Sequence, residues 1–285
     1  SLGSSISSIK SVKFNKRAFM TASRGHSTDV LGVSYLSSSV ISLWFKAENT
    51  RAIGTDAMNS ASIISRGLND QDDNESHGMA FDIRLIRDEG LFANVGNMRG
   101  MGSVARGHGV PPGGDPPVIG TSPRGMVASE LQHTASLIDD AWHHVALAWY
   151  YASVTEHSMS LYVDGVRVAS GSTGTGSAPA TGGGSAILIG INPPRANQVP
   201  DERVRHQASF QGYVDEISFF TGSIYNASAG TWNDAIIENL YNHGNPTDVS
   251  ASAPIASTGG TALNLLSHYR MGEHANDTQT LTNSY

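Results

Sequence analysis

The segment that most constrains the fold is the apolar run at residues 142–149, which follows a period of two. The residues of one face are Val145, Leu147 and Trp149, and those of the other are Trp142, Ala146 and Ala148. Successive side chains of a strand point to opposite faces of a sheet, and here both faces are apolar. The segment therefore predicts a central β-strand that is covered on both sides.

A hairpin is predicted about twelve residues further along the chain. Two β-rich runs, at residues 161–163 and 166–168, flank the pair Asp164-Gly165. This pair readily takes the positive φ angles that a two-residue type I′ turn demands. The sequence thus predicts two antiparallel strands that meet at Asp164 and Gly165.

The two segments, WHHVALAW and LYVDGVRVASG, resemble the centre of the laminin-G-like, concanavalin-A-like jelly-roll superfamily. Five other segments are similar to motifs of that superfamily and follow its order, at residues 40–46, 62–67, 187–190, 210–217 and 238–246. The resemblance covers roughly residues 30–246. It implies an all-β, concanavalin-A-like (laminin-G-like) jelly-roll β-sandwich with one short helix and long loops.

Length and composition favour one main domain, because a β-sandwich often exceeds 200 residues as a single unit. We expect an N-terminal strand or arm at residues 1–24, the sandwich at 25–248, and a linker with a C-terminal strand at 249–285 that packs back on the sandwich. Segments rich in Gly, Pro and Ser at residues 103–130, 170–185 and 192–206 predict the long loops, because proline donates no hydrogen bond to a strand ladder.

Charge and hydropathy exclude two classes of partner. The chain has 18 basic and 25 acidic residues, with a net charge of −7, and its basic residues form no stripe that could follow a phosphate backbone. No apolar run reaches the roughly 18 residues of a membrane span. We therefore expect neither nucleic-acid binding nor membrane insertion, and the Ser-rich start at residues 1–8 lacks the features of a signal peptide.

One helix is predicted between Thr231 and Asn242, where it would cover part of the sandwich. Its apolar stripe consists of Ile236, Ile237, Leu240 and Tyr241. Thr231 is the candidate N-cap, and Gly244 followed by Pro246 is the stop signal.

No arrangement typical of catalysis occurs in the chain. Glucanases on this fold need two carboxylates about 5 Å apart, and a resemblance to them would require a Glu-x-Asp-x-Glu or Glu-x-Asp-x-x-Glu strand, which is absent here. Asp215 and Glu216 are adjacent, so we expect their side chains on opposite faces, where one of them anchors a turn. His143 and His144 should likewise diverge as packed strand residues that share no metal. The sequence predicts a non-enzymatic protein.

An acidic segment, residues 69–75, is the candidate metal site. Calcium favours clustered oxygen ligands on a loop, and the candidate ligands are Asp70, Asp72, Asp73 and Glu75. An EF-hand is ruled out, because Glu75 stands at loop position six and Phe81 at position twelve. Two interpretations stay open, a solvated acidic loop and a calcium site.

Four aromatic residues lie near expected strand ends or loops and are candidates for stacking on a sugar ring. They are Tyr150, Tyr151, Tyr225 and Trp232. Aromatic residues near strand ends also pack in cores, so a sugar platform and a core role both stay open.

The C-terminal segment Tyr269-Arg270-Met271-Gly272-Glu273 resembles the corresponding part of laminin-G-like proteins encoded by marine tailed bacteriophages. That resemblance implies a structural and interaction protein of the virion, a capsid decoration or tail-associated protein, with other virion proteins and further copies of the chain as partners. The alternative is a lectin-like adhesion module, secreted or on a cell surface, that binds host-surface glycans with the help of calcium.

Overall fold

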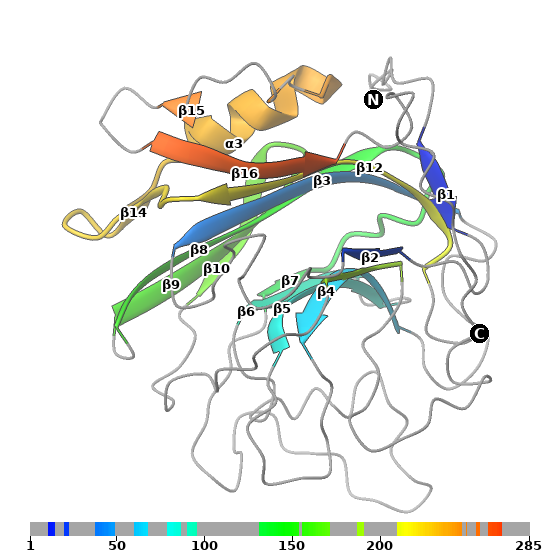
Figure 1. The fold of residues 1–285 in the computed structure, drawn as a ribbon, viewed down its shortest axis with the longest axis horizontal. Coiled ribbons are helices and arrows are strands. Elements are labelled where there is room, and N and C mark those ends of the chain that lie inside the picture. The colour runs from blue at the N-terminus through cyan, green and yellow to red at the C-terminus, as the bar shows by residue number, and fades with distance from the viewer. Residues whose placement is uncertain are drawn as a thin grey trace, which may run out of the picture.

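The computed structural model describes residues 11–14, 20–22, 38–48, 60–67, 79–86, 90–95, 131–153, 156–171, 187–190, 210–246, 249, 255–256 and 262–269. These residues form two antiparallel β-sheets stacked as layers, with a short helix on the outer side of the larger sheet (Figure 1). The predicted all-β sandwich with one short helix is confirmed.

The larger sheet has eight strands among the described residues. Its strands are β1 (Val12–Phe14), β3 (Ser39–Ala47), β8 (His143–Ser153), β9 (Glu156–Val163), β10 (Val166–Gly171), β12 (Gly212–Thr221), β15 (Ile255–Ala256) and β16 (Ala262–Tyr269). They follow the order β10-β9-β8-β3-β12-β16-β15. Strand β1 pairs with the first residues of β12, whereas β16 pairs with its later residues.

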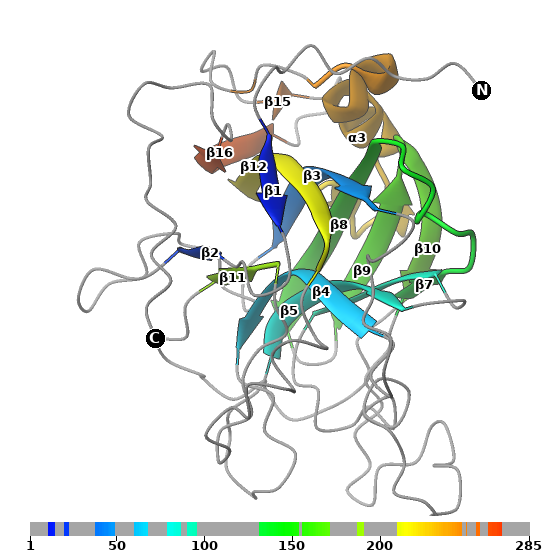
Figure 2. The same cartoon turned by 90° about the vertical axis from the view of Figure 1, so that its right-hand side faces the viewer.

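The smaller sheet closes the other side of the sandwich. Its strands are β2 (Met20–Ala22), β4 (Ser60–Gly67), β5 (Met79–Ile86), β6 (Gly90–Val95), β7 (Leu131–His133) and β11 (Ile187–Ile189). They follow the order β2-β11-β4-β5-β6-β7. Figure 2 shows the same layers from the side on which β1 lies along β12.

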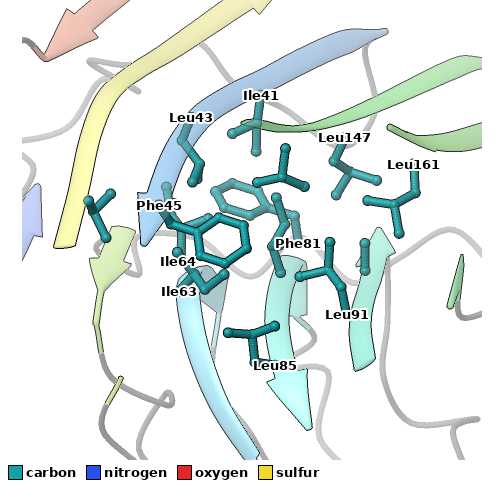
Figure 3. Close-up of a cluster of buried hydrophobic side chains, with 14 of the residues drawn as sticks. Ile41, Leu43, Phe45, Ile63, Ile64, Phe81, Leu85, Leu91, Leu147 and Leu161 are labelled. Atoms are coloured by element: carbon teal, nitrogen blue, oxygen red, sulfur yellow. The ribbon is translucent and has the colours of Figure 1, made fainter. Parts of the chain in front are cut away.

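The hydrophobic core lies between the two sheets (Figure 3). Strand β8 contributes Val145, Leu147 and Trp149 to it, all at most 2% exposed. Phe45 on β3 and Phe81 on β5 approach this core from opposite sheets. The alternation that predicted a central strand is confirmed, since Ala146 and Ala148 lie on the other face of β8.

That other face packs against helix α3 (Asp234–Tyr241), which continues into the 3₁₀ turn η2 (Asn242–Gly244). The helix buries its predicted apolar stripe through Ile236, Ile237 and Leu240. A second hydrophobic cluster thus forms on the outer side of the larger sheet, with the helix as its cover (Figure 1).

The predicted start of the helix is wrong. Thr231 belongs to strand β14 (Thr231–Trp232), which pairs with β13 (Tyr225–Asn226), and the residue before the helix is Asn233. The backbone N–H of Asn233 donates to the carbonyl of Ile224 at 2.7 Å, so the hairpin extends up to the helix. The predicted end is confirmed: Asn242 takes a left-handed conformation and Gly244 has φ +91°.

The predicted turn at Asp164-Gly165 is confirmed. Both residues have positive φ, +49° and +79°, and the flanking residues Val163 and Val166 are paired across the hairpin. A Cβ on Gly165 would approach the Tyr241 side chain at 2.8 Å. The turn therefore packs against the end of α3.

The expected domain boundaries stay predictions, and most of the expected long loops lie outside the described residues. Within the described part of the chain, no helix is long and apolar enough to cross a membrane.

Candidate functional site

The structure brings together three of the four aromatic residues proposed as a sugar platform. The rings of Tyr150 and Tyr225 lie 5.1 Å apart between centroids, and those of Tyr225 and Trp232 lie 4.9 Å apart. Their planes are inclined to one another by 42° and 50°. We call Tyr150, Tyr225 and Trp232 the aromatic triad; all three side chains are half-buried.

Two elements position the triad on the outer side of the larger sheet. Tyr150 lies on β8 two residues after Ala148, which packs in the outer cluster, and Trp232 packs against the same cluster. Tyr225 and Trp232 are direct partners across the β13–β14 hairpin. In Figure 1 this hairpin, labelled at β14, lies at the end of the sheet opposite β1.

Local hydrogen bonds fix the hairpin. The Ser223 hydroxyl accepts a hydrogen bond from the Tyr225 N–H at 2.9 Å and donates to the Tyr225 carbonyl at 3.2 Å. The Asn226 side chain accepts from the Ala229 N–H at 3.1 Å and shapes the turn. Ile224, 1% exposed, anchors the hairpin in the outer cluster. The rings are therefore held in place before any ligand arrives.

Tyr151, the fourth candidate, does not join the triad. It follows Tyr150 on β8, so the strand alternation turns its side chain to the other face. Its backbone N–H donates to the Ser38 hydroxyl at 3.1 Å. Sequence reasoning had no signal to separate the two tyrosines, because the hairpin that selects Tyr150 is distant in sequence.

The two adjacent histidines diverge, as predicted. The His143 imidazole lies between two carboxylates, with Nδ1 2.9 Å from Asp164 and Nε2 3.1 Å from Asp139. Burial lowers the pKa of His143, but the hydrogen bonds and charges of Asp164 and Asp139 outweigh it and raise the pKa above its usual value. His143 thus links the Asp164-Gly165 turn to the loop before β8, and we call His143, Asp139 and Asp164 together the His143 clasp.

His144 lies on the outer face beneath Trp44 and Tyr241, whose rings are stacked 5.7 Å apart. Its Nε2 is 2.8 Å from the Ser42 hydroxyl, and burial lowers its pKa to about 4. Among the described residues no group forms a hydrogen bond with its Nδ1. Both side chains are buried, Ser42 at 5% and His144 at 0% exposed.

Asp215 and Glu216 also have structural roles. Asp215 accepts a hydrogen bond from the Glu216 N–H at 2.8 Å, and Glu216 contacts His268 Nε2 at 2.6 Å with both side chains 6% exposed. The prediction of opposite faces is wrong: a bulge in β12, where Glu216 has φ +50°, turns its side chain toward His268 on the outer face, the face of Asp215. The residue types of this segment did not reveal the bulge in advance.

The candidate calcium ligands, Asp70, Asp72, Asp73 and Glu75, lie outside the described residues. Over the ranges that the structure describes, no three His, Cys, Asp or Glu side chains gather as metal ligands would. The calcium site therefore stays a prediction.

The fold is a concanavalin-A-like, laminin-G-like jelly-roll sandwich. The family model described as the concanavalin A-like lectin/glucanases superfamily matches residues 106–228, which is less than half of the chain. This range includes Tyr150 and Tyr225 of the aromatic triad. No curated protein matches the chain.

The chain is also similar to solved structures from several sources. A heptameric SAP-like pentraxin from Limulus polyphemus is 10% identical, with a TM-score of 0.41 over 88% of this chain and 93% of the pentraxin. Domains LG4-5 of the mouse laminin alpha1 chain are 14% identical, with a TM-score of 0.43 over 77% of this chain and 45% of that one. A putative carbohydrate binding protein from Bacteroides ovatus is 13% identical, with a TM-score of 0.46 over 93% and 53%. The chain thus spans only about half of the last two.

Proposed function

We propose that the chain is a non-catalytic carbohydrate-binding module that uses the aromatic triad as its sugar platform. The observation that carries this proposal is the gathering of Tyr150, Tyr225 and Trp232 at one end of the larger sheet. The family match to a lectin and glucanase superfamily supports it.

The geometry of the triad suits a pyranose ring. Aromatic rings offer large apolar area with a polar rim, and a sugar presents apolar C–H faces bordered by hydroxyls. The inclined rings form an angled surface, with the exposed Asn226 side chain on the same hairpin. Since the hairpin is already ordered by its own hydrogen bonds, binding costs little conformational entropy.

The absence of catalysis is part of this proposal. The buried carboxylates of β12, Asp215 and Glu216, are 0% and 6% exposed, so neither reaches a glycosidic bond at the surface. A retaining glycosidase would need two carboxylates about 5 Å apart beside the bound sugar.

Two features of the predicted function stay proposals of their own. Calcium assistance rests on the acidic segment 69–75. The place on a phage virion rests on the resemblance of residues 269–273, of which the structure describes only Tyr269, at the end of β16. A module that binds host glycans would serve on a virion as well as on a secreted protein.

The test is a screen of immobilised glycans with the purified chain and with Tyr225→Ser. We expect the wild-type chain to retain at least one class of glycan, and the variant to bind that class about tenfold more weakly, the range of an interface anchor. Thermal unfolding of both proteins controls for folding. Equal retention of every glycan by both proteins would contradict the proposal.

A further inference from the structure

The distribution of lysine marks a second surface, away from the aromatic triad. The chain has four lysines, Lys10, Lys13, Lys16 and Lys46, all within its first 46 residues, although its net charge is −7. Lys13 lies on β1 and Lys46 on β3. The other two lie outside the described residues.

Strand register places Lys13 and Lys46 on either side of one tyrosine. At this point β12 lies between β1 and β3, and Tyr213 is the direct partner of Lys13 on one side and of Lys46 on the other. Direct partners in antiparallel strands share a face, with Cβ atoms about 5 Å apart. The three side chains therefore form a row across three strands.

The row faces away from the sandwich core. The next residue of each strand, Phe14 on β1 and Val214 on β12, is 0% exposed between the sheets, and so is Phe45, which precedes Lys46. Since side chains alternate along a strand, Lys13, Tyr213 and Lys46 lie on the outer face. Lys46 and Tyr213 are half-buried, and Lys13 is exposed.

A second aromatic ring extends the row. Trp142, just before β8, has its ring 6.3 Å from that of Tyr213, inclined by 53°. The Lys13 ammonium lies 5.1 Å from the centre of the Tyr213 ring. Lys13 also forms an ion pair with Glu48, and the hydrogen bonds of Glu48 and Tyr213 raise its pKa, so Lys13 is charged at neutral pH.

We infer that Trp142, Lys46, Tyr213 and Lys13 form a second binding surface, selective for saccharides that carry carboxylate or sulfate groups. The two aromatic rings provide apolar contact for a sugar ring, and the two ammonium groups flank it where an anionic substituent would lie. The surface lies at the β1 end of the sheet, opposite the β13–β14 hairpin (Figure 1). It goes beyond the proposed function and does not depend on it.

Glu48 gives this surface a distinctive property. Its carboxylate forms an ion pair with the Lys13 ammonium when no ligand is bound, so an anionic ligand would compete with Glu48 for Lys13. Removal of the Glu48 charge should therefore strengthen anion binding, whereas a purely structural role of the ion pair predicts no gain.

The experiment measures retention of the full chain by affinity electrophoresis in gels that contain dextran sulfate, polygalacturonate, or dextran as the uncharged counterpart. At low salt we expect at least one of the two charged polymers to retain the chain. Dextran should not be bound by this surface. The sulfated and the carboxylated polymer distinguish the two possible anions. Retention should fall as salt rises, because exposed charges are screened.

Four variants test the residues. Lys46→Gln should weaken binding to the charged polymer about threefold or more, and Tyr213→Ser about fivefold, in line with one exposed charge contact and one aromatic contact. Glu48→Gln should strengthen it, by up to about threefold. Arg167→Gln, a charge removed from β10 of the same sheet, is the matched control and should leave retention unchanged.

Three results would overturn the inference. The first is no retention by either charged polymer, and the second is an equal loss for Arg167→Gln and Lys46→Gln. The third is retention by the charged polymers that is unchanged in Tyr213→Ser, which would show simple ion exchange. Tyr225→Ser, which alters the aromatic triad, should bind the charged polymers as the wild type does, so failure at one site is distinguishable from failure at the other.

Discussion

His143 and His144 show how position in a strand determines the protonation of a side chain. Alternation sends His143 to a rim where Asp164 and Asp139 stabilise its charged form, whereas His144 is enclosed by Trp44 and Tyr241 and is neutral. Burial alone acts on His144 with little compensation, and its pKa falls to about 4. Near pH 6, His143 is therefore charged and His144 is neutral.

The His143 clasp should stabilise the fold in a pH-dependent way. Its pKa in the folded chain lies above the unfolded value of about 6.5, so the contribution is complete below pH 6.5 and is lost as pH rises through the folded value. His143→Gln should lower the free energy of unfolding by about 1 kcal/mol or less at pH 5.5, because Asp139 is half exposed and screened. Urea unfolding of the wild type and the variant at pH 5.5 and pH 8.5 measures how this loss of stability depends on pH.

Asp139 sets the lower limit of this window. The backbone N–H of Ala141 and then His143 lower its pKa against an opposing effect of burial, so its contribution disappears as pH falls below about 4. In a chain that carries Asp139→Asn, the effect of His143→Gln on stability should differ less between pH 5.5 and pH 8.5. A destabilisation by His143→Gln that is larger at pH 8.5 than at pH 5.5 would contradict the clasp.

At this scale the sequence predicted divergence of the histidines but not their partners. Asp139 and Asp164 are 4 and 21 residues from His143, and only the hairpin register brings Asp164 to it. The same limit applies to Glu216, whose contact with His268 depends on a bulge and on a strand 52 residues away.

At the scale of elements, the β9–β10 hairpin and α3 stabilise each other. Tyr162 on β9 donates a hydrogen bond to Asp234 at 2.9 Å, and Arg167 on β10 pairs with the same carboxylate at 3.3 Å. At the other end of the helix, Tyr241 lies against Gly165. The first turn and the last residue of α3 are therefore both attached to one hairpin.

Gly165→Ala tests this packing. The residue has φ +79°, and an added Cβ would lie 2.8 Å from the Tyr241 ring, so we expect a destabilisation of about 1 kcal/mol or more. The neighbouring Val166, 64% exposed, provides the control: Val166→Ala should change stability by less than about 0.5 kcal/mol. Chemical denaturation of both variants gives the comparison, and equal stabilities would argue against a packed turn.

Elements were predictable where one local signal decided them. Asp164-Gly165 defined a turn, and the apolar pattern of residues 142–149 defined a buried strand. The start of α3 was not predictable, because Thr231 is a good N-cap residue but is paired with Asn226 in a two-residue strand. Pairing across the hairpin competed with capping and prevailed.

For the whole molecule, the two candidate surfaces lie at opposite ends of the larger sheet, with α3 on the outer side between them (Figure 1). The fold could be predicted from the order of its motifs. All three residues of the aromatic triad were among the four candidates, but the sequence did not exclude Tyr151, because the contact that selects Tyr150 is made by a hairpin about 75 residues away.

Calcium assistance makes a further prediction for the whole chain. If the acidic segment binds calcium, 1 mM calcium should raise the thermal midpoint of the wild type, because a ligand that binds only the folded state stabilises it. Asp70→Asn combined with Asp72→Asn should abolish the increase and leave the midpoint without calcium nearly unchanged. A calcium effect of equal size in both proteins would place the ion elsewhere.

The most direct test of carbohydrate recognition compares two neighbouring tyrosines. Tyr150→Ser and Tyr151→Ser remove half-buried rings from adjacent positions of β8. The Tyr150 ring lies 5.1 Å from that of Tyr225, whereas strand alternation turns Tyr151 to the other face. Titration calorimetry with a glycan retained in the screen should show about a tenfold loss of affinity for Tyr150→Ser and wild-type affinity for Tyr151→Ser. Equal affinities in the two variants would contradict the assignment of the aromatic triad as the sugar platform.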